Sequence, residues 1–172
     1  LNEAKAERNQ AVNNLKEKLS EIKERIDKLR KNQITYPQNT VKLKEAIKTE
    51  FDNRSIDSDV RVFADLLEIT KPEWQNAVEG YLNTQRFNII VEPQYYDVAA
   101  EVYDRFKAQI EGVALINTHA LDLKNEPQEN TLASVVSSKN RYAKAYANYL
   151  MGRVVLCNEV VELKQHSIAI TS

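Results

Sequence analysis

The stretch WQNAVEGYLNTQRFNIIVEP, residues 74–93, changes its hydrophobic periodicity part-way along. Its first part places apolar side chains three and four residues apart, which is the spacing of one helix face: Trp74, Ala77, Val78, Tyr81 and Leu82. A polar turn follows, and then the short apolar run from Phe87 to Val91 is typical of a buried strand. The stretch therefore predicts a helix that leads directly into a buried strand, as in α/β architecture.

A second part of the chain resembles this one. FADLLEITKPEWQNAVEGYL (63–82) aligns with LASVVSSKNRYAKAYANYL (132–150) if one gap is allowed, so that Trp74 matches Tyr142 and Ala77 matches Ala145. Each copy continues into an apolar run, RFNIIV or RVVLC. Either the match arises by chance, or the globular part consists of two related α/β halves with small sheets and flanking helices.

The rest of the globular part alternates between helical and extended patterns. Residues 40–54 predict a helix with Val41, Leu43, Ala46, Ile47 and Phe51 facing a core. Further helices are expected at 95–110, 142–151 and, as a short one, 160–165. Strands are expected near 67–69, at 113–116 and at 153–157, and the last residues look extended. The segment 119–130 is polar, contains Pro127 and predicts a long connection.

Residues 1–33 have a different character. They contain no Gly or Pro, and apolar side chains recur in steps of three and four at Val12, Leu15, Leu19, Ile22, Ile26 and Leu29. Such a narrow seam among Lys, Glu, Arg and Asp is typical of a coiled coil, and it requires a second helix. The alternative is a solvated helix on the surface of its own domain. Because Pro37 ends the helical pattern, we expect two domains, a coiled-coil arm at 1–33 and a globular domain at 34–172.

The composition argues against several kinds of active site. Only three glycines occur in the 172 residues, and no phosphate-binding loop is present. His119 and His166 lack the spacing of a metal site, and the one cysteine, Cys157, lies in an apolar run and predicts a small buried side chain. We therefore expect no enzyme activity and no cofactor in this chain, and neither catalytic nor metal-binding residues.

The charges favour weak contact with nucleic acid. Residues 1–33 carry nine Lys and Arg against six Asp and Glu, whereas the chain as a whole has a formal charge of −1. Lys139, Arg141 and Lys144 form a second basic group, and we expect these three residues to contact DNA phosphates without regard to sequence. The alternative is that these charges only solvate helices. No apolar stretch is long enough to predict a membrane span, so a cytoplasmic location without membrane contact is expected.

An arm that leads into two similar α/β halves resembles the hinge of structural-maintenance-of-chromosomes (SMC) proteins. The segments that carry the resemblance are ADLLEI (64–69), AVEGYL with RFNIIV (77–91), GVALI (112–116) and YLMGRVVLCNEV (149–160). The run EITKPEWQNAVEGYLNTQRFNIIVEP is similar to the hinge of JetC, the condensin-like subunit of bacterial Wadjet plasmid-defence systems, and to MukB-like proteins. The likeness covers residues 34–172, and the heptads of 1–33 suit the ascending arm.

The resemblance implies a homodimer formed through the hinge, in a DNA-loop-extruding ATPase whose heads lie outside these residues. It implies a descending coiled-coil arm of the same protein and accessory condensin-like subunits as further partners, and a nucleoid-associated location. The implied dimer interface consists of Tyr149, Gly152, Arg153, Val154, Val155 and Leu156. The chain departs from the family at Asn83-Thr84, where a glycine is common.

Two other functions stay open. The chain could be a coiled-coil adaptor domain that recruits a protein partner. It could also be the apex of an SbcC-type DNA-repair ATPase, although that apex uses a CxxC zinc hook and only one cysteine is present.

Overall fold

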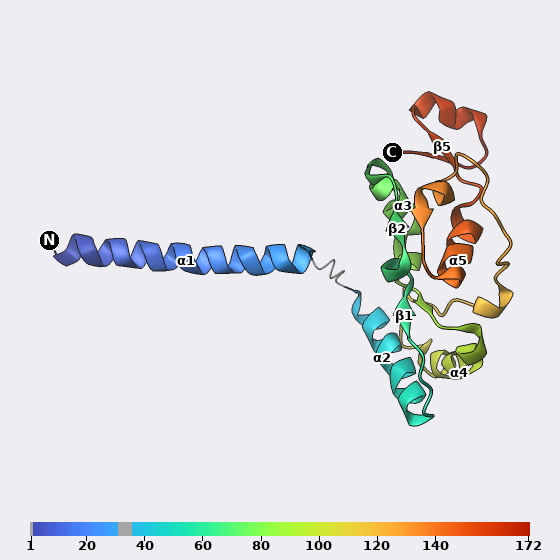
Figure 1. Cartoon of the computed structure of the whole chain (residues 1–172), viewed down its shortest axis with the longest axis horizontal. Helices are drawn as coiled ribbons and strands as arrows, with labels where there is room; N and C mark the ends of the chain where they lie inside the picture. Colours follow the sequence, from blue (N-terminus) through green and yellow to red (C-terminus); the bar gives the residue numbers. More distant parts are fainter. Residues whose placement is uncertain (1, 31–35) are drawn as a thin grey trace. The chain divides into compact units, whose positions relative to one another are not determined.

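The computed structural model describes residues 2–30 and 36–172, and the chain divides into two compact units at residues 35 and 36 (Figure 1). The first unit contains one long helix, α1 (Asn2–Arg30). Four side chains of the expected seam, Val12, Leu15, Leu19 and Ile22, are between 46% and 67% exposed. The side chains of Ile26 and Leu29 lie outside the described residues. The described seam therefore remains accessible to another helix.

The second unit begins with α2 (Gln38–Asn53), which starts directly after Pro37. The ring of Pro37 fixes its φ, here −55°, and its ψ of 145° is extended, so the helix begins after it. Leu43, Ile47 and Phe51 recur every four residues and are buried, as the periodicity predicts. Val41 was expected in the core but is 42% exposed, because it lies beyond the edge of the face that Leu43, Ile47 and Phe51 bury.

Three small sheets, each of two strands, make up the described β-structure of this unit. β1 (Arg61–Val62) pairs antiparallel with β3 (Ile89–Ile90), and β2 (Glu68–Ile69) pairs antiparallel with β4 (Val136–Ser137). β5 (Val155–Cys157) pairs parallel with β6 (Ala169–Thr171). The unit is thus a mixed α/β domain, as expected from the alternating patterns.

The two segments that align in sequence have the same order of elements. The first contains the 3₁₀ helix η1 (Phe63–Leu66), β2, η2 (Pro72–Trp74) and α3 (Gln75–Leu82), and continues through η3 (Asn83–Phe87) into β3. The second contains η6 (Leu132–Val135), β4 and α5 (Arg141–Met151), and continues into β5. The aligned residues Phe63 and Leu132 make equivalent backbone hydrogen bonds. Phe63 N–H donates to the carbonyl of Asn88, just before β3, at 2.9 Å, and Leu132 N–H donates to the carbonyl of Val154, just before β5, at 2.7 Å.

The two segments share one hydrophobic core. β2 and β4 join them as an antiparallel pair, and buried side chains from both pack together, among them Phe63, Trp74, Leu132, Met151 and Leu156. The ring of Phe63 contacts that of Tyr146 edge to face, with centroids 4.9 Å apart. Burying these aromatic and aliphatic groups, at about 25 cal/mol per Å² of apolar surface, holds the two segments together.

A second core lies where α2 packs against α4 (Tyr96–Phe106), which follows η4 (Pro93–Tyr95). In this unit α2 and α4 lie at one end, β5 lies at the other, and α3 and α5 lie between them (Figure 1). The Phe51 ring packs against that of Tyr95 at 5.8 Å between centroids. The expected helix at 95–110 is therefore present but ends earlier, at Phe106.

Some expected elements are shorter in the structure. The predicted strand at 113–116 forms a single parallel bridge, from Leu115 to Ile89, and the strand predicted at 153–157 begins at Val155. The short helix predicted near residue 160 is the 3₁₀ helix η7 (Val160–Gln165), and another, η5 (Thr118–Ala120), lies in the long connection. Across the described ranges, every helix is too short or too polar to cross a lipid bilayer.

Candidate functional site

Strand β5, where the expected dimer residues lie, has neighbours on both sides within the chain. On one side it pairs with β6, and Val155 N–H donates to Ile168 O at 3.0 Å. On the other side Leu132 N–H donates to Val154 O at 2.7 Å, and Leu156 N–H donates to Asn130 O at 2.9 Å. The backbone of β5 is therefore engaged internally and cannot pair with a strand of another chain.

The six residues expected at the dimer interface separate into two groups. The side chains of Val154 and Leu156 are buried in the shared core, and Gly152 is buried beside them. Val155 is half-buried. Only Tyr149, which is 72% exposed, and Arg153 are freely accessible. The accessible surface at this end of the domain therefore lies beside β5 rather than on it.

Gly152 has a steric role inside the chain. A Cβ at this position would lie 2.3 Å from the carbonyl oxygen of Asn148 and 3.7 Å from the Cα of Pro127. Because the first distance is far below any real contact, the absence of a side chain lets the end of α5 turn towards β5. The close approach that the glycine permits is therefore between parts of one chain.

Two backbone edges remain open, at equivalent positions in the two segments. Ile89 N–H donates to Ala114 O and Ile116 N–H donates to Ile89 O, so the N–H and C=O of Leu115 point away from β3. Ala169 is paired with Val155 in the same way as Leu115 is paired with Ile89. The N–H and C=O of Ala169 therefore point away from β5. In the described residues, neither edge has a second strand beside it.

The open edge of β6 lies next to exposed apolar side chains. Val160 and Val161 of η7, which connects β5 to β6, are 70% and 69% exposed, and Ile168 is 46% exposed. Exposed aliphatic groups beside an unpaired strand are typical of an interaction surface. We call this the β6 surface, defined by Val160, Val161 and residues 168–171.

The three basic residues proposed for DNA contact differ in availability. Lys139 and Arg141 are exposed at the start of α5, where Arg141 stacks on Tyr142 with 4.8 Å between the guanidinium carbon and the ring centroid. Lys144 is half-buried, and its ammonium donates to the carbonyls of Ala133 at 3.1 Å and Val136 at 2.6 Å. Burial lowers its pKa. Lys144 therefore holds η6 and β4 against α5, and Lys139 and Arg141 are the more available of the three residues expected to contact DNA.

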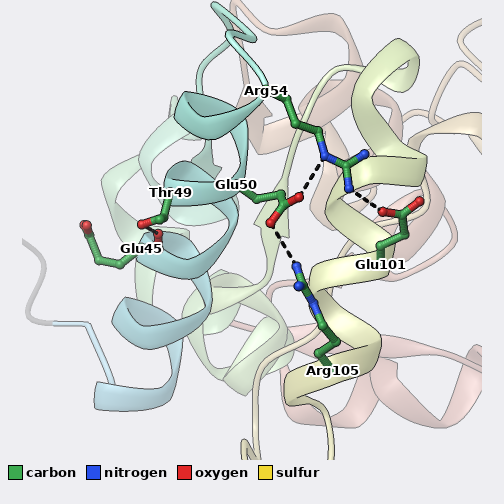
Figure 2. Close-up of polar contacts among 6 residues, drawn as sticks. All are labelled: Glu45, Thr49, Glu50, Arg54, Glu101 and Arg105. Carbon is green, nitrogen blue, oxygen red and sulfur yellow. Dashed lines mark hydrogen bonds and ion pairs between the residues drawn. The ribbon is translucent and has the colours of Figure 1, made fainter.

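A polar network that the sequence did not reveal connects α2 to α4 (Figure 2). Arg54 donates to Glu50 and to Glu101, both at 2.7 Å, and Arg105 donates to Glu50 at 3.0 Å. The bonds from Arg105 and Arg54 lower the pKa of Glu50. The network crosses between helices 55 residues apart in sequence, so only the i, i+4 pair of Glu50 and Arg54 could have been recognised beforehand.

The residue that departs from the expected family pattern has an unusual backbone. Asn83 ends α3 with φ +46° and ψ −124°, a region that L side chains rarely adopt and that glycine adopts without strain. A glycine-like turn is thus retained at this position although the residue is asparagine.

Comparison with known families gives a direct match. The sequence profile of the flexible hinge domain of SMC proteins matches residues 56–162, more than half of the chain. This chain belongs to the SMC hinge family. A comparison with curated proteins found no match.

Solved SMC hinges have the same fold. The hinge of Pyrococcus furiosus SMC has 16% identity and a TM-score of 0.52, covering 78% of this chain and 82% of that one. An asymmetric dimer of the Geobacillus stearothermophilus SMC hinge has 10% identity and a TM-score of 0.57, covering 88% and 62%. The Pyrococcus furiosus hinge with an extended coiled coil has 18% identity and a TM-score of 0.50, covering 90% and 57%. The chain thus spans less than two thirds of the latter two.

Proposed function

We propose that residues 34–172 form the dimerisation hinge of an SMC-like ATPase, and that residues 1–33 are its ascending coiled-coil arm. The observation that carries the proposal is the pair of open edges at Leu115 and at Ala169. They occupy equivalent places in two similar halves, so a two-fold axis can bring the Leu115 edge of one chain beside the β6 edge of another. The contact then occurs twice and closes without exposing a further edge. The asymmetric dimer described for the Geobacillus hinge supports self-association in this family.

The β6 surface supplies the apolar part of this proposed interface. Val160, Val161 and Ile168 would be covered on pairing, and Tyr149 and Arg153 would lie at its margin. Gly152, Val154, Val155 and Leu156 contribute by shaping the strand that supports β6. Interfaces of this kind combine strand pairing with a few buried hydrophobic side chains.

Cysteine cross-linking tests the pairing. Leu115→Cys and Ala169→Cys are introduced together, and the full chain is oxidised and separated on a non-reducing gel. Directly opposed residues of an antiparallel pair have Cβ atoms about 5 Å apart, so the double variant is expected to form covalent dimers. Each single variant is the matched control and should give only traces, because position 115 faces position 169 of the other chain. Equal cross-linking of a single variant would contradict this arrangement.

We also propose a more specific role for the chain, as a JetC- or MukB-like subunit in plasmid defence or chromosome organisation. The support is the similarity of residues 68–93 to the hinges of those proteins. ATP hydrolysis, the descending arm and the accessory subunits would belong to parts of the complex outside this chain. The test is a plasmid-maintenance assay in cells that carry the complete system: Ala169→Pro in the hinge should restore plasmid retention, whereas Val41→Ser should not.

We also propose weak DNA contact through Lys139 and Arg141. Both are exposed at the start of α5, and the neighbouring Lys144 is engaged with carbonyls. Contacts from these two side chains give a modest affinity that falls with salt, by a log–log slope of about −0.9 per phosphate contacted, and is insensitive to base sequence. Fluorescence anisotropy with two unrelated duplexes at low and physiological salt tests this proposal, and a tenfold difference between the sequences would contradict it.

A further inference from the structure

A cavity lies between α5 and the connection that joins the two halves. Its volume is about 320 Å³, at the lower end of the range for small-ligand sites. The walls are mainly apolar and aromatic, and the residues that matter here are Ile116, Leu121, Asp122, Asn125, Tyr146 and Tyr149. Neither the β6 surface nor Lys139 and Arg141 belong to its lining.

The cavity is held in shape by contacts from both walls. Asn148 of α5 donates from its side-chain amide to Asn125 O at 2.9 Å, which fixes the connection against the helix. Asp122 accepts the Lys124 N–H at 2.9 Å, which orients its carboxylate. The ring of Tyr146 is fixed against Phe63 and stacks on Tyr149, with centroids 6.4 Å apart and planes at 16°. The site therefore needs little rearrangement before it binds a ligand.

Tyr149 is more exposed than Tyr81, its counterpart in the first half. Tyr81 aligns with Tyr149, but it is 41% exposed and donates its hydroxyl to Leu150 O at 3.3 Å. Tyr149 is 72% exposed and forms the accessible aromatic wall of the cavity. A large aromatic side chain exposed beside a preformed cavity is typical of a recognition site.

The charges of the site select the ligand. Asp122 is the one charged residue in the described lining, and a carboxylate can accept more bonds than the one it makes. The same connection carries Glu126 and Glu129 against one basic residue, Lys124. A ligand with a cationic head and an apolar stem would satisfy both the carboxylate and the aromatic wall.

We propose that this cavity binds an arginine side chain of a partner protein. The planar guanidinium would stack on Tyr149 and donate to Asp122, while its aliphatic stem would lie along Leu121 and Tyr146. Arginine suits the site better than lysine, because its flat head can stack on a ring and pair with a carboxylate together. The proposal does not rest on dimerisation, because Asp122, Leu121 and Tyr146 are not part of the proposed dimer interface and Tyr149 lies only at its margin.

The test uses the full chain and two matched compounds, Nα-acetyl-arginine amide and the neutral, nearly isosteric Nα-acetyl-citrulline amide. NMR titration should give saturable shifts of the Asn125 and Tyr149 signals, with the arginine compound binding about tenfold more tightly. Asp122→Asn should remove this preference, and Tyr149→Ala should remove saturable binding. Tyr81→Ala, the matched tyrosine of the other half, should change neither.

Several results would overturn the proposal. They are equal binding of both compounds, a preference that survives Asp122→Asn, or no saturable shift in a chain whose NMR spectrum shows it to be folded. Tyr149 shifts that depend on protein concentration and vanish in Asp122→Asn would assign the cavity to an arginine of a second copy, contrary to the proposed partner. Failure of the cross-linking between positions 115 and 169 would leave this result unaffected.

Discussion

Glu68 lies directly opposite Ser137 in the antiparallel pair of β2 and β4, and these two residues occupy the same position in the two similar segments. A residue that pairs with its own counterpart marks the local two-fold relationship between the segments. The relationship extends outward to Phe63 and Leu132, whose N–H groups make the same bond, and to the open edges at Leu115 and Ala169. The organisation proposed for the dimer thus follows from the arrangement within one chain.

Gly152 and Gly80 should respond oppositely to alanine. A Cβ at Gly152 would meet Asn148 O at 2.3 Å, so Gly152→Ala should lower the free energy of unfolding by about 1–3 kcal/mol, the cost of overpacking. At Gly80, inside α3, no atom lies within 4 Å of the added Cβ, so Gly80→Ala should raise it by about 0.5–1 kcal/mol. Urea denaturation of the two variants measures both. A harmless Gly152→Ala would show that the end of α5 can move.

Asn83→Gly should stabilise the domain. The backbone of Asn83 has φ +46° and ψ −124°, and glycine relieves that strain at the expense of greater freedom in the unfolded chain. We expect a net gain of about 0.5–1 kcal/mol in the free energy of unfolding and a comparable or larger loss for Asn83→Val. Asn76→Gly, at an exposed helical position of α3, is the control and should destabilise. The account of this turn is wrong if both glycine variants destabilise equally.

Glu50→Gln should lower the Tm at neutral pH but not in acid. The bonds from Arg105 and Arg54 lower the pKa of Glu50 in the folded state below its ordinary value of 4.5. Its contribution to stability is therefore present above that value and is lost as the pH falls through the folded-state pKa. The Tm of wild type and variant should converge on acidification, as followed by circular dichroism. Glu45→Gln is the control, because its carboxylate is directed away from α4 (Figure 2).

Charge reversal should separate DNA contact from stability. Lys139→Glu with Arg141→Glu should weaken DNA binding and reduce the log–log salt slope by about 0.9 for each lost phosphate contact, with an unchanged Tm. Lys144→Met should instead lower the Tm, because the carbonyls of Ala133 and Val136 lose a donor, and should leave the salt slope as it was. Anisotropy and thermal melts on the same samples measure both. A salt slope that changes only with Lys144→Met would reverse the assignment.

Much of the fold could be predicted from local patterns. The buried positions of α2 and α3 follow the helical period, Cys157 is buried as its apolar surroundings indicate, and the two aligned segments have the same order of elements. Val41 was misplaced because periodicity alone does not define the edge of a buried face. The strand predicted at 113–116 is reduced to one bridge. The length of a strand depends on how far its partner, here β3, runs beside it, and the local pattern does not contain that information.

The candidate site was less accessible to such reasoning. The apolar run at residues 153–157 predicts a strand equally well whether its edges are free or occupied, and only the partners of Val154 and Leu156 show that β5 is enclosed. The bonds from Lys144 to two carbonyls are likewise invisible in a basic cluster. The extended pattern of residues 168–171 was the available signal for β6. Its parallel pairing with β5 could not be predicted, because it depends on residues that are not its neighbours in sequence.

Sedimentation equilibrium tests the central claim, that this chain dimerises through the open edge of β6. The full chain carries Leu15→Glu and Ile22→Glu throughout, so that association of the arm does not contribute. Ala169→Pro removes only an outward-pointing N–H and leaves the bonds of Ile168 and Ile170 to Val155 in place. At micromolar concentrations we predict a dimer for the parent and for Val41→Ser, and a folded monomer for Ala169→Pro. A monomeric parent, or a dimer that persists in Ala169→Pro with an unchanged dissociation constant, would contradict the account.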